Sequence, residues 1–260
     1  MAPSYPFRRA LVTGASSGIG EAMVELLAAA GVATVVVARR RDRLDEIAAR
    51  LPRVEVLAAD LTTAAGLASV DERIAAGGKD KVDLVVNNAG FGTSGEFYLL
   101  DADRLAEEVE LNVIALTRLS RAALGVMVPR GHGYLLNVSS MASFQPAPRL
   151  AVYAATKAYV TSLTESLHEE VSGTGVHVTA LCPGLTRTEF QSVSNTESYA
   201  TKFPGFAWTE ARDVAATGLD DVAKGRALSV PGLLYKGMLS AGGFVPRSLM
   251  RRLSGLVQRR

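Results

Sequence analysis

The stretch Thr-Gly-Ala-Ser-Ser-Gly-Ile-Gly at residues 13–20 decides the fold, because it joins an apolar strand pattern at 8–14 to a helical pattern at 21–30. A glycine-rich turn between strand and helix brings backbone N–H groups and the positive end of the helix close to an anion. Gly14 permits the turn, Gly18 allows close approach to a pyrophosphate, and Gly20 lets the helix pack on the strand. The spacing is G-x-x-x-G-x-G with no Gly-Lys-Ser/Thr after it, so this is not a P-loop. The alternative is a turn needed only for tight packing.

Strand patterns alternate with helical patterns along the chain. The expected strands are 8–14, 33–38, 54–58, 82–86, 134–138, 176–181 and 227–230, and the expected helices are 21–30, 42–51, 64–76, one or two within 97–127, and one that carries Tyr153 and runs to about Glu170. Such alternation predicts a parallel sheet covered on both faces, with ligands at the carboxyl ends of the strands. We therefore expect an α/β protein with a three-layer, doubly wound Rossmann fold, a parallel seven-stranded sheet and a single domain over residues 1–260.

The second expected strand ends in the basic run Arg39-Arg40-Arg41. In a dinucleotide fold the end of this strand reaches the adenosine ribose, where an acidic residue accepts from the 2′-hydroxyl and arginine accommodates a 2′-phosphate. Arginine here favours NADP(H) over NAD(H). The alternative is a run that begins a solvated helix, which is our expectation for Arg41 and Arg43.

Polar and small residues follow the next two strands. Asp60 and Leu61 come after 54–58, and Asp60 either accepts from the adenine amino group or caps the next helix. Asn-Asn-Ala-Gly at 87–90 offers amides that can brace neighbouring strands and small residues that leave room for a flat ligand, or it is an ordinary turn. Asn112 lies inside an apolar helical run, where it indicates either a kink with a bound water or a surface amide.

The residue types needed for proton transfer lie between Ser139 and Lys157. Tyr153 and Lys157 are spaced i, i+4, so on a helix both side chains point from one face. A phenol ionises near pH ~10 in water, and an ammonium group one turn away lowers that pKa. A serine hydroxyl from another element can then hydrogen-bond a substrate oxygen. Taken alone, the spacing also fits a solvated lysine beside a half-buried tyrosine.

Together these features resemble the short-chain dehydrogenase/reductase (SDR) family, in its single-domain branch of about this length. The resemblance covers residue 8 to about residue 235, and its motifs are individually modest and jointly specific. They are Thr-Gly-x-x-x-Gly-x-Gly at 13–20, Asn-Asn-Ala-Gly at 87–90, Asn112, Ser140, Tyr153-x-x-x-Lys157 and Pro183-Gly184. Ser140 lies thirteen residues before Tyr153, the family's usual interval, and is therefore preferred to Ser139.

The resemblance implies four catalytic residues. Tyr153 is the general acid/base, and Lys157 lowers the pKa of Tyr153 and bonds the nicotinamide ribose. Ser140 holds the substrate oxygen, and Asn112 keeps a water that continues a proton relay from Lys157. The implied reaction interconverts a secondary alcohol and a ketone, or an alcohol and an aldehyde, by hydride transfer.

The resemblance also implies the cofactor contacts. Arg39 stands where NAD-preferring members carry Asp, Thr188 matches a threonine that contacts the cofactor, and Thr186 replaces the usual branched aliphatic residue. The predicted contacts to NADP(H), with NAD(H) the less favoured cofactor, are Gly14, Ser16, Ser17, Gly18, Ile19, Gly20, Arg39, Arg40, Asp60, Leu61, Asn87, Ala89, Gly90, Tyr153, Lys157, Pro183, Gly184, Thr186 and Thr188.

Composition argues against several other classes. Apolar residues make up 48% of the 260 residues and charged residues 21%, which fits a packed core rather than disorder. A net charge of +2 gives no case for nucleic-acid binding. Cys182 is the only cysteine and the three histidines are scattered, so we expect no disulfide and no metal site. We see no signal peptide and no membrane-spanning run, so the expected location is the cytoplasm.

Two C-terminal segments have separate predictions. Residues 185–213 are expected to form a mobile substrate lid, whose aromatic residues suggest an apolar, lipid-like substrate or else pack the lid onto the core. These aromatic residues are Phe190, Tyr199, Phe203, Phe206 and Trp208. Residues 233–260 contain no Asp or Glu and form a basic amphipathic tail. The tail predicts peripheral contact with an anionic membrane surface, or packing against the substrate site or a sister subunit.

The leading interpretation is an NADP(H)-dependent oxidoreductase that acts on a small-molecule carbonyl or alcohol. A catalytically silent NAD(P)-binding sensor or scaffold is one alternative, against which the intact Ser-Tyr-Lys set argues. A sugar-nucleotide epimerase or dehydratase is another, against which the chain length and the glycine spacing argue. The family resemblance further implies a homodimer or homotetramer.

Overall fold

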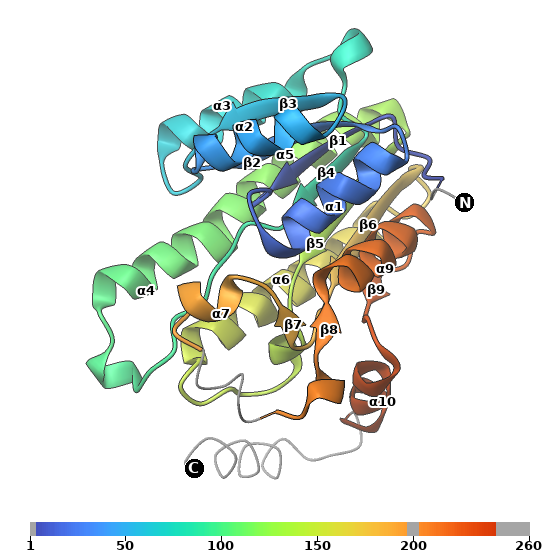
Figure 1. The fold of residues 1–260 in the computed structure, drawn as a ribbon. Coiled ribbons are helices and arrows are strands. Elements are labelled where there is room, and N and C mark those ends of the chain that lie inside the picture. The colour runs from blue at the N-terminus through green and yellow to red at the C-terminus, as the bar shows by residue number, and fades with distance from the viewer. Residues whose placement is uncertain (1–3, 197–202, 243–260) are drawn as a thin grey trace.

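The structure is a computed structural model that describes residues 4–196 and 203–242. Its centre is a seven-stranded sheet with the order β3-β2-β1-β4-β5-β6-β9, in which every pairing is parallel (Figure 1). The strands are β1 (Arg9–Thr13), β2 (Ala33–Ala38), β3 (Val54–Ala58), β4 (Leu84–Asn87), β5 (Gly133–Val138), β6 (Val176–Leu181) and β9 (Leu228–Ser229). The predicted parallel seven-stranded sheet is confirmed.

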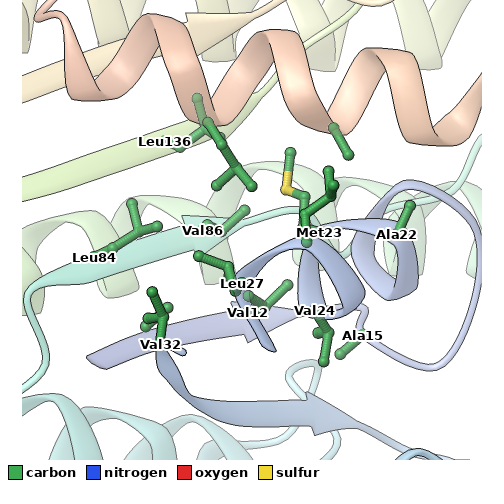
Figure 2. Close-up of a cluster of buried hydrophobic side chains, with 14 of the residues drawn as sticks. Val12, Ala15, Ala22, Met23, Val24, Leu27, Val32, Leu84, Val86 and Leu136 are labelled. Atoms are coloured by element: carbon green, nitrogen blue, oxygen red, sulfur yellow. The ribbon is translucent and has the colours of Figure 1, made fainter. Parts of the chain in front are cut away.

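Helices cover both faces of this sheet (Figure 1). They are α1 (Gly18–Ala29), α2 (Arg41–Arg50), α3 (Ala64–Ala75), α5 (Leu116–Arg130), α6 (Ala151–Glu170) and α9 (Ala211–Ala223). One face packs α1, α2 and α9 in a cluster that includes Val12, Met23 and Leu219, and Figure 2 shows Met23 of α1 beside the strands. The other face packs α3, α5 and α6 in a cluster that includes Leu11 and Leu119. Leu11 and Val12 are adjacent, so β1 is buried on both faces, which explains its unbroken apolar pattern.

The strand order reverses between β1 and β4. In a doubly wound sheet the connections leave in opposite directions at such a point, which opens a crevice at the carboxyl ends of the strands. The turns after β1, β4, β5 and β6 all reach this edge, and they carry most of the predicted site residues. The three-layer Rossmann architecture predicted from the alternation is therefore confirmed.

The run expected to form one or two helices at 97–127 is more complex. A 3-10 turn, η2 (Phe97–Leu99), precedes α4 (Ala102–Val109), a π-helical segment, η3 (Glu110–Ala115), and α5. The continuous helix Ala102–Arg130 is long and apolar enough, by length and composition, to cross a membrane. No such segment was expected from the sequence. In this fold α5 packs against α3 and β5, as the core helix of an α/β domain does.

The C-terminal third adds elements below the main sheet (Figure 1). Within the predicted lid, β7 (Thr186–Arg187) pairs in parallel with β8 (Thr209–Glu210), and α7 (Phe190–Val193) and η5 (Gly205–Ala207) lie between them in the chain. The sequence did not predict this second sheet, and Tyr199 of the lid lies outside the described residues. The predicted tail begins with α10 (Leu233–Gly242), while its remainder, 243–260, also lies outside them.

Candidate active site

A cavity of about 1610 Å³ lies at the carboxyl edge of the sheet. It brings together most of the site residues predicted from the sequence, namely Gly14, Ser16, Ser17, Gly18, Ile19, Arg39, Arg40, Asp60, Leu61, Ala89, Gly90, Ser140, Tyr153, Lys157, Pro183, Gly184, Thr186 and Thr188. Three predicted residues, Gly20, Asn87 and Asn112, do not line it. Each of these three packs behind the cavity wall.

The turn between β1 and α1 forms one wall. Gly14 and Gly18 have φ of 64° and 61°, in the left-handed region that favours glycine. α1 begins at Gly18, and the preceding Ser17 makes no capping hydrogen bond with its side chain. The N–H groups of the first helical turn therefore suit an anion such as a pyrophosphate. Thr188 lies across the turn, since a Cβ on Gly18 would come within 3.0 Å of its Cγ2.

Gly20 packs α1 onto the turn. A Cβ at this position would stand 2.4 Å from the carbonyl oxygen of Gly14 and 2.6 Å from Nδ2 of Asn88. Gly20→Ala is therefore expected to displace the turn, to lower the free energy of unfolding by about 1–3 kcal/mol and to weaken NADPH binding. Thermal unfolding and NADPH fluorescence titration measure the two effects. Gly77→Ala is the control, because nothing lies within 4 Å of a Cβ there. A melting temperature for Gly20→Ala equal to that of the wild type would contradict this packing argument.

Arg39 and Arg40 lie at the end of β2. Nη1 of Arg39 is 3.4 Å from Glu107, and the Arg39 side chain is 60% exposed. Arg40 donates to the hydroxyl of Ser16 at 3.1 and 3.3 Å and to its carbonyl oxygen at 3.2 Å. Arg40 also pairs with Glu189 of the predicted lid at 3.1 Å. Two guanidinium groups beside the glycine turn suit a phosphate next to an adenosine ribose.

Asp60 lines the cavity and does not cap α3. Its Oδ1 accepts from the N–H of Thr62 at 3.0 Å and from the Thr62 hydroxyl at 2.7 Å. The cap is Thr63, whose hydroxyl accepts from the N–H of Gly66 at 3.1 Å. Burial raises the pKa of Asp60, but the Thr62 hydrogen bonds and the charge of Arg39 outweigh it, so the pKa lies below its ordinary value. The capping alternative is therefore wrong, and the adenine contact stays a prediction.

The two asparagines at the end of β4, Asn87 and Asn88, face different ways. Nδ2 of Asn87 donates to Asn137 at 2.9 Å and to Ser120 at 3.1 Å, so this side chain joins β4 to β5 and α5 outside the cavity. Nδ2 of Asn88 donates to two carbonyl oxygens at the end of β1, at 2.9 and 3.2 Å, and fixes the glycine turn. The predicted bracing by amides is present, but the side chain of Asn87 does not reach the cofactor cavity. Successive side chains of a strand point to opposite faces, which separates the two roles.

Asn112 lies in the π-helical segment η3 and is buried. Its Oδ1 accepts from the N–H of Phe91 at 3.2 Å, and its Nδ2 donates to the carbonyl of Phe91 at 2.8 Å and to Thr156 at 3.1 Å. The amide thus joins the segment after β4 to α6, beside Lys157. The surface-amide alternative is wrong, and an irregularity in the helix is present as a π segment, a feature frequent at functional sites. The water relay through Asn112 stays a prediction.

Three of the four predicted catalytic residues, Ser140, Tyr153 and Lys157, meet at one end of the cavity. α6 carries Tyr153 and Lys157, both buried, with Nζ of Lys157 5.8 Å from the centre of the Tyr153 ring. Nζ of Lys157 donates to the carbonyl oxygen of Val138 at 2.8 Å, which fixes α6 against the end of β5. Ser140 begins the turn η4 (Met141–Phe144) and lies close enough to Tyr153 for its hydroxyl to lower the pKa of the phenol. Ser139 instead donates to the carbonyl of Lys157 at 2.8 Å inside the protein, so the geometry favours Ser140.

The pKa values of this pair differ from the sequence expectation. Burial raises the pKa of Tyr153 to about 12, against the lowering effect of the Ser140 hydroxyl. Burial lowers the pKa of Lys157 to about 8. Tyr153 therefore holds its proton at neutral pH. The expected lowering of the Tyr153 pKa by Lys157 is not found: desolvation of the phenolate is the largest effect, and the charge of Glu108 raises the pKa further.

α10 closes the cavity, as one of the alternatives for the tail predicted, but the sequence did not single out Tyr235. The hydroxyl of Tyr235 accepts from the N–H of Leu185 at 2.9 Å and donates to the carbonyl of Ala207 at 2.5 Å. Leu234, Tyr235 and Met238 line the cavity, so this part of the predicted tail packs against the site. The only sequence signal for this packing was the helical spacing of these three apolar residues. The same spacing fits a helix face packed on the protein and a helix face bound to a membrane.

The fold and the site define a class of protein: a doubly wound dinucleotide-binding protein with a serine, a tyrosine and a lysine at one end of its crevice. Within the described residues, no three His, Cys, Asp or Glu side chains are grouped to hold a metal ion. Comparison with known families then matches the short chain dehydrogenase family over residues 8–198. The chain belongs to this family and is an oxidoreductase that uses a nicotinamide cofactor on small-molecule substrates.

Individual relatives agree with this assignment. An uncharacterized oxidoreductase from Staphylococcus epidermidis is 35% identical over 182 residues, which are 69% of this chain and 78% of that protein. The structure of a short-chain dehydrogenase from Sphingobium yanoikuyae in complex with NADPH has a TM-score of 0.80 and 32% identity, over 92% of this chain and 97% of that one. A bulky-bulky ketone specific alcohol dehydrogenase from Comamonas testosteroni has a TM-score of 0.76 and 30% identity, over 93% and 96% of the two chains.

Proposed function

We propose that this protein is an NADPH-dependent reductase of bulky, apolar ketones or aldehydes, with Tyr153 as the general acid. One observation carries the proposal: Ser140, Tyr153 and Lys157 meet in one cavity whose other end is formed by the glycine turn and Arg39. The same residues serve the reverse oxidation of a secondary alcohol. The intact set argues against a silent sensor on the same fold.

The cavity residues fit NADP(H). The N-terminus of α1 and the glycine turn suit the pyrophosphate, and Arg39 and Arg40 suit a 2′-phosphate. Gly90 packs closely beside the catalytic lysine, since a Cβ there would stand 2.8 Å from Oδ1 of Asn112 and 3.4 Å from Nζ of Lys157, so only glycine keeps this part of the cavity wall clear of a side chain. When bound, the nicotinamide supplies or accepts the hydride. The NADPH complex of the Sphingobium relative supports this choice over NAD(H).

The residues of the chain handle the proton of the substrate oxygen. Tyr153, whose pKa of about 12 keeps it protonated, donates its proton to a carbonyl oxygen as negative charge develops there. Ser140 donates a hydrogen bond to the same oxygen. The ammonium group of Lys157 uses one N–H for Val138, and its remaining N–H groups serve the cofactor ribose and stabilise the phenolate that Tyr153 becomes.

The substrate end of the cavity is apolar. Its side chains come from η4, the loop before α6, the lid and α10, and they include Met141, Phe144, Leu150, Phe190, Val193, Trp208, Leu234 and Met238. The ring of Phe190 lies 5.3 Å from that of Tyr153, so apolar surface reaches the catalytic phenol. Such a lining favours a carbonyl compound with large aliphatic or aromatic substituents. The printed specificity of the Comamonas relative for bulky-bulky ketones supports the same class.

The proposal also includes the lid, the oligomeric state and the basic tail. Residues 185–213 serve as the substrate lid, and the Arg40–Glu189 ion pair and the position of Thr188 over Gly18 support its placement across the glycine turn. The family resemblance implies a homodimer or homotetramer, which we expect in the cytoplasm, and peripheral membrane contact through the basic tail is one of the alternatives that its composition predicts.

The test is a panel of ketones, aldehydes and alcohols monitored by NADPH absorbance and repeated with NADH. We expect NADPH oxidation with bulky apolar ketones and little with small polar ones. Tight NADPH binding without turnover in either direction would support the silent sensor instead.

A further inference from the structure

Glu108 of α4 is a buried carboxyl group that the proposed reaction does not use. Its side chain has no exposed surface, and neither carboxyl oxygen has a hydrogen-bond partner among the described residues. Burial of an unpaired carboxylate is costly, and a core-facing helix position ordinarily carries an apolar residue. A charge at this position must therefore act strongly on the groups around it, because little solvent screens it.

The groups that face Glu108 come from three elements. α4 packs against α6, which carries Tyr153 and Lys157, and Glu108 is the buried residue of α4. Thr93, which follows β4, and Arg104, one turn earlier on α4, act on Glu108 electrostatically, and the charge of Glu108 acts on Tyr153 and Lys157. Arg104 is engaged elsewhere, since its guanidinium lies 3.9 Å above the ring of Phe91 and donates to the carbonyl of a lid residue at 3.2 Å. The charge of Arg104 therefore interacts with Phe91 and the lid as well as with Glu108.

Lys157 has two acidic neighbours that act on its charge, Cys182 and Glu108. Burial raises the pKa of the Cys182 thiol to about 11, so this thiol carries no charge at neutral pH. Glu108 thus supplies the negative charge that acts on Lys157 at neutral pH, within the described part of the chain. Burial raises the pKa of Glu108 to about 7, against the effects of Thr93, Arg104 and Lys157.

We propose that Glu108 is a positioning residue whose buried carboxylate holds a proton on Lys157, and that Lys157 in turn orients Tyr153 and the cofactor ribose. The catalytic consequence rests on the proposed function, whereas the charge coupling does not. The two groups are charged together between about pH 7 and about pH 8. Carbonyl reduction is expected to be fastest in this window and to fall above it, because Lys157 then loses its charge.

The test measures the titration of Lys157 directly in the full chain without cofactor. The chain has six lysines, and ¹³C-labelled lysine gives one NMR signal for each, with Lys157 assigned from its loss in Lys157→Met. In Glu108→Gln the pKa of Lys157 is expected to fall by roughly one unit, and Glu108→Asp should restore most of it. Glu110→Gln, which removes a carboxylate two residues along the helix that points to another side, should leave the Lys157 titration unchanged. If the pKa of Lys157 in Glu108→Gln equals that in the wild type, the proposal is overturned.

A reciprocal measurement covers the case in which Glu108→Gln does not fold. Coupling between two sites is symmetric. Loss of the Lys157 charge in Lys157→Met must therefore raise the pKa of Glu108 by as much as the Glu108 charge raises the pKa of Lys157. Labelling with ¹³C-glutamate follows the pKa of Glu108. If the pKa of Glu108 in Lys157→Met equals that in the wild type, the proposal is also overturned. With a substrate from the panel, the alkaline limb of kcat/KM should move to lower pH in Glu108→Gln and stay in place in Glu110→Gln. If no substrate is found, the NMR results still decide the coupling.

Discussion

Tyr153→Phe is expected to lower kcat for carbonyl reduction by roughly 10²–10⁴-fold while NADPH binding stays as in the wild type. Phenylalanine keeps the ring packed against Phe190 but has no proton to donate to the substrate oxygen. The loss should appear in kcat, because proton donation is needed in the transition state and contributes little to substrate binding. Stopped-flow turnover and fluorescence titration with NADPH measure the two quantities separately.

Tyr159→Phe is the matched control for this experiment. Tyr159 lies on the same helix, but it is exposed and its hydroxyl hydrogen-bonds Thr117 at 2.9 Å, away from the cavity. We expect wild-type turnover from it. Equal turnover in Tyr153→Phe and the wild type would remove Tyr153 from the reaction, whereas a loss of NADPH binding in Tyr153→Phe would indicate a structural role.

Arg39→Asp is expected to reverse the cofactor preference. Loss of a charge-assisted hydrogen bond to the 2′-phosphate costs about 1.5–3 kcal/mol, or roughly ten- to hundredfold in kcat/KM with NADPH. The new carboxylate repels that phosphate and accepts from the 2′-hydroxyl of NADH, so kcat/KM with NADH should rise. The ratio of the two kcat/KM values, measured with one ketone, reports the change.

Arg41→Asp is the control for the charge change. The Arg41 side chain is 71% exposed and pairs with Asp45 at 3.6 Å on the outer surface of α2. Arg41→Asp should therefore keep the wild-type preference between NADPH and NADH. If Arg39→Asp also keeps that preference, the 2′-phosphate contact must be reassigned to Arg40, which already contacts Ser16 beside the glycine turn.

Local sequence predicted the elements of the fold well, because each buried parallel strand is a continuous apolar run and each connecting helix is amphipathic. The long helix from Ala102 was less predictable, since nothing in a 3.6-residue pattern marks where a π segment will form. The pairing of β7 with β8 was missed because each strand has two polar residues and lies outside any apolar run. The predicted site motifs come together because every parallel strand delivers its next turn to the same edge.

By itself, the sequence determined the doubly wound sheet, the glycine turn and the spacing that puts Tyr153 and Lys157 on one helical face. Only the tertiary structure decided which of Asn87 and Asn88 lines the cavity, how Tyr235 closes the cavity over a chain separation of fifty residues, and that Glu108 is buried on a helix packed against the one that carries Lys157. The reason is physical. Strand and helix patterns are local, whereas desolvation and the pKa values that it shifts depend on which distant segments exclude water from a side chain.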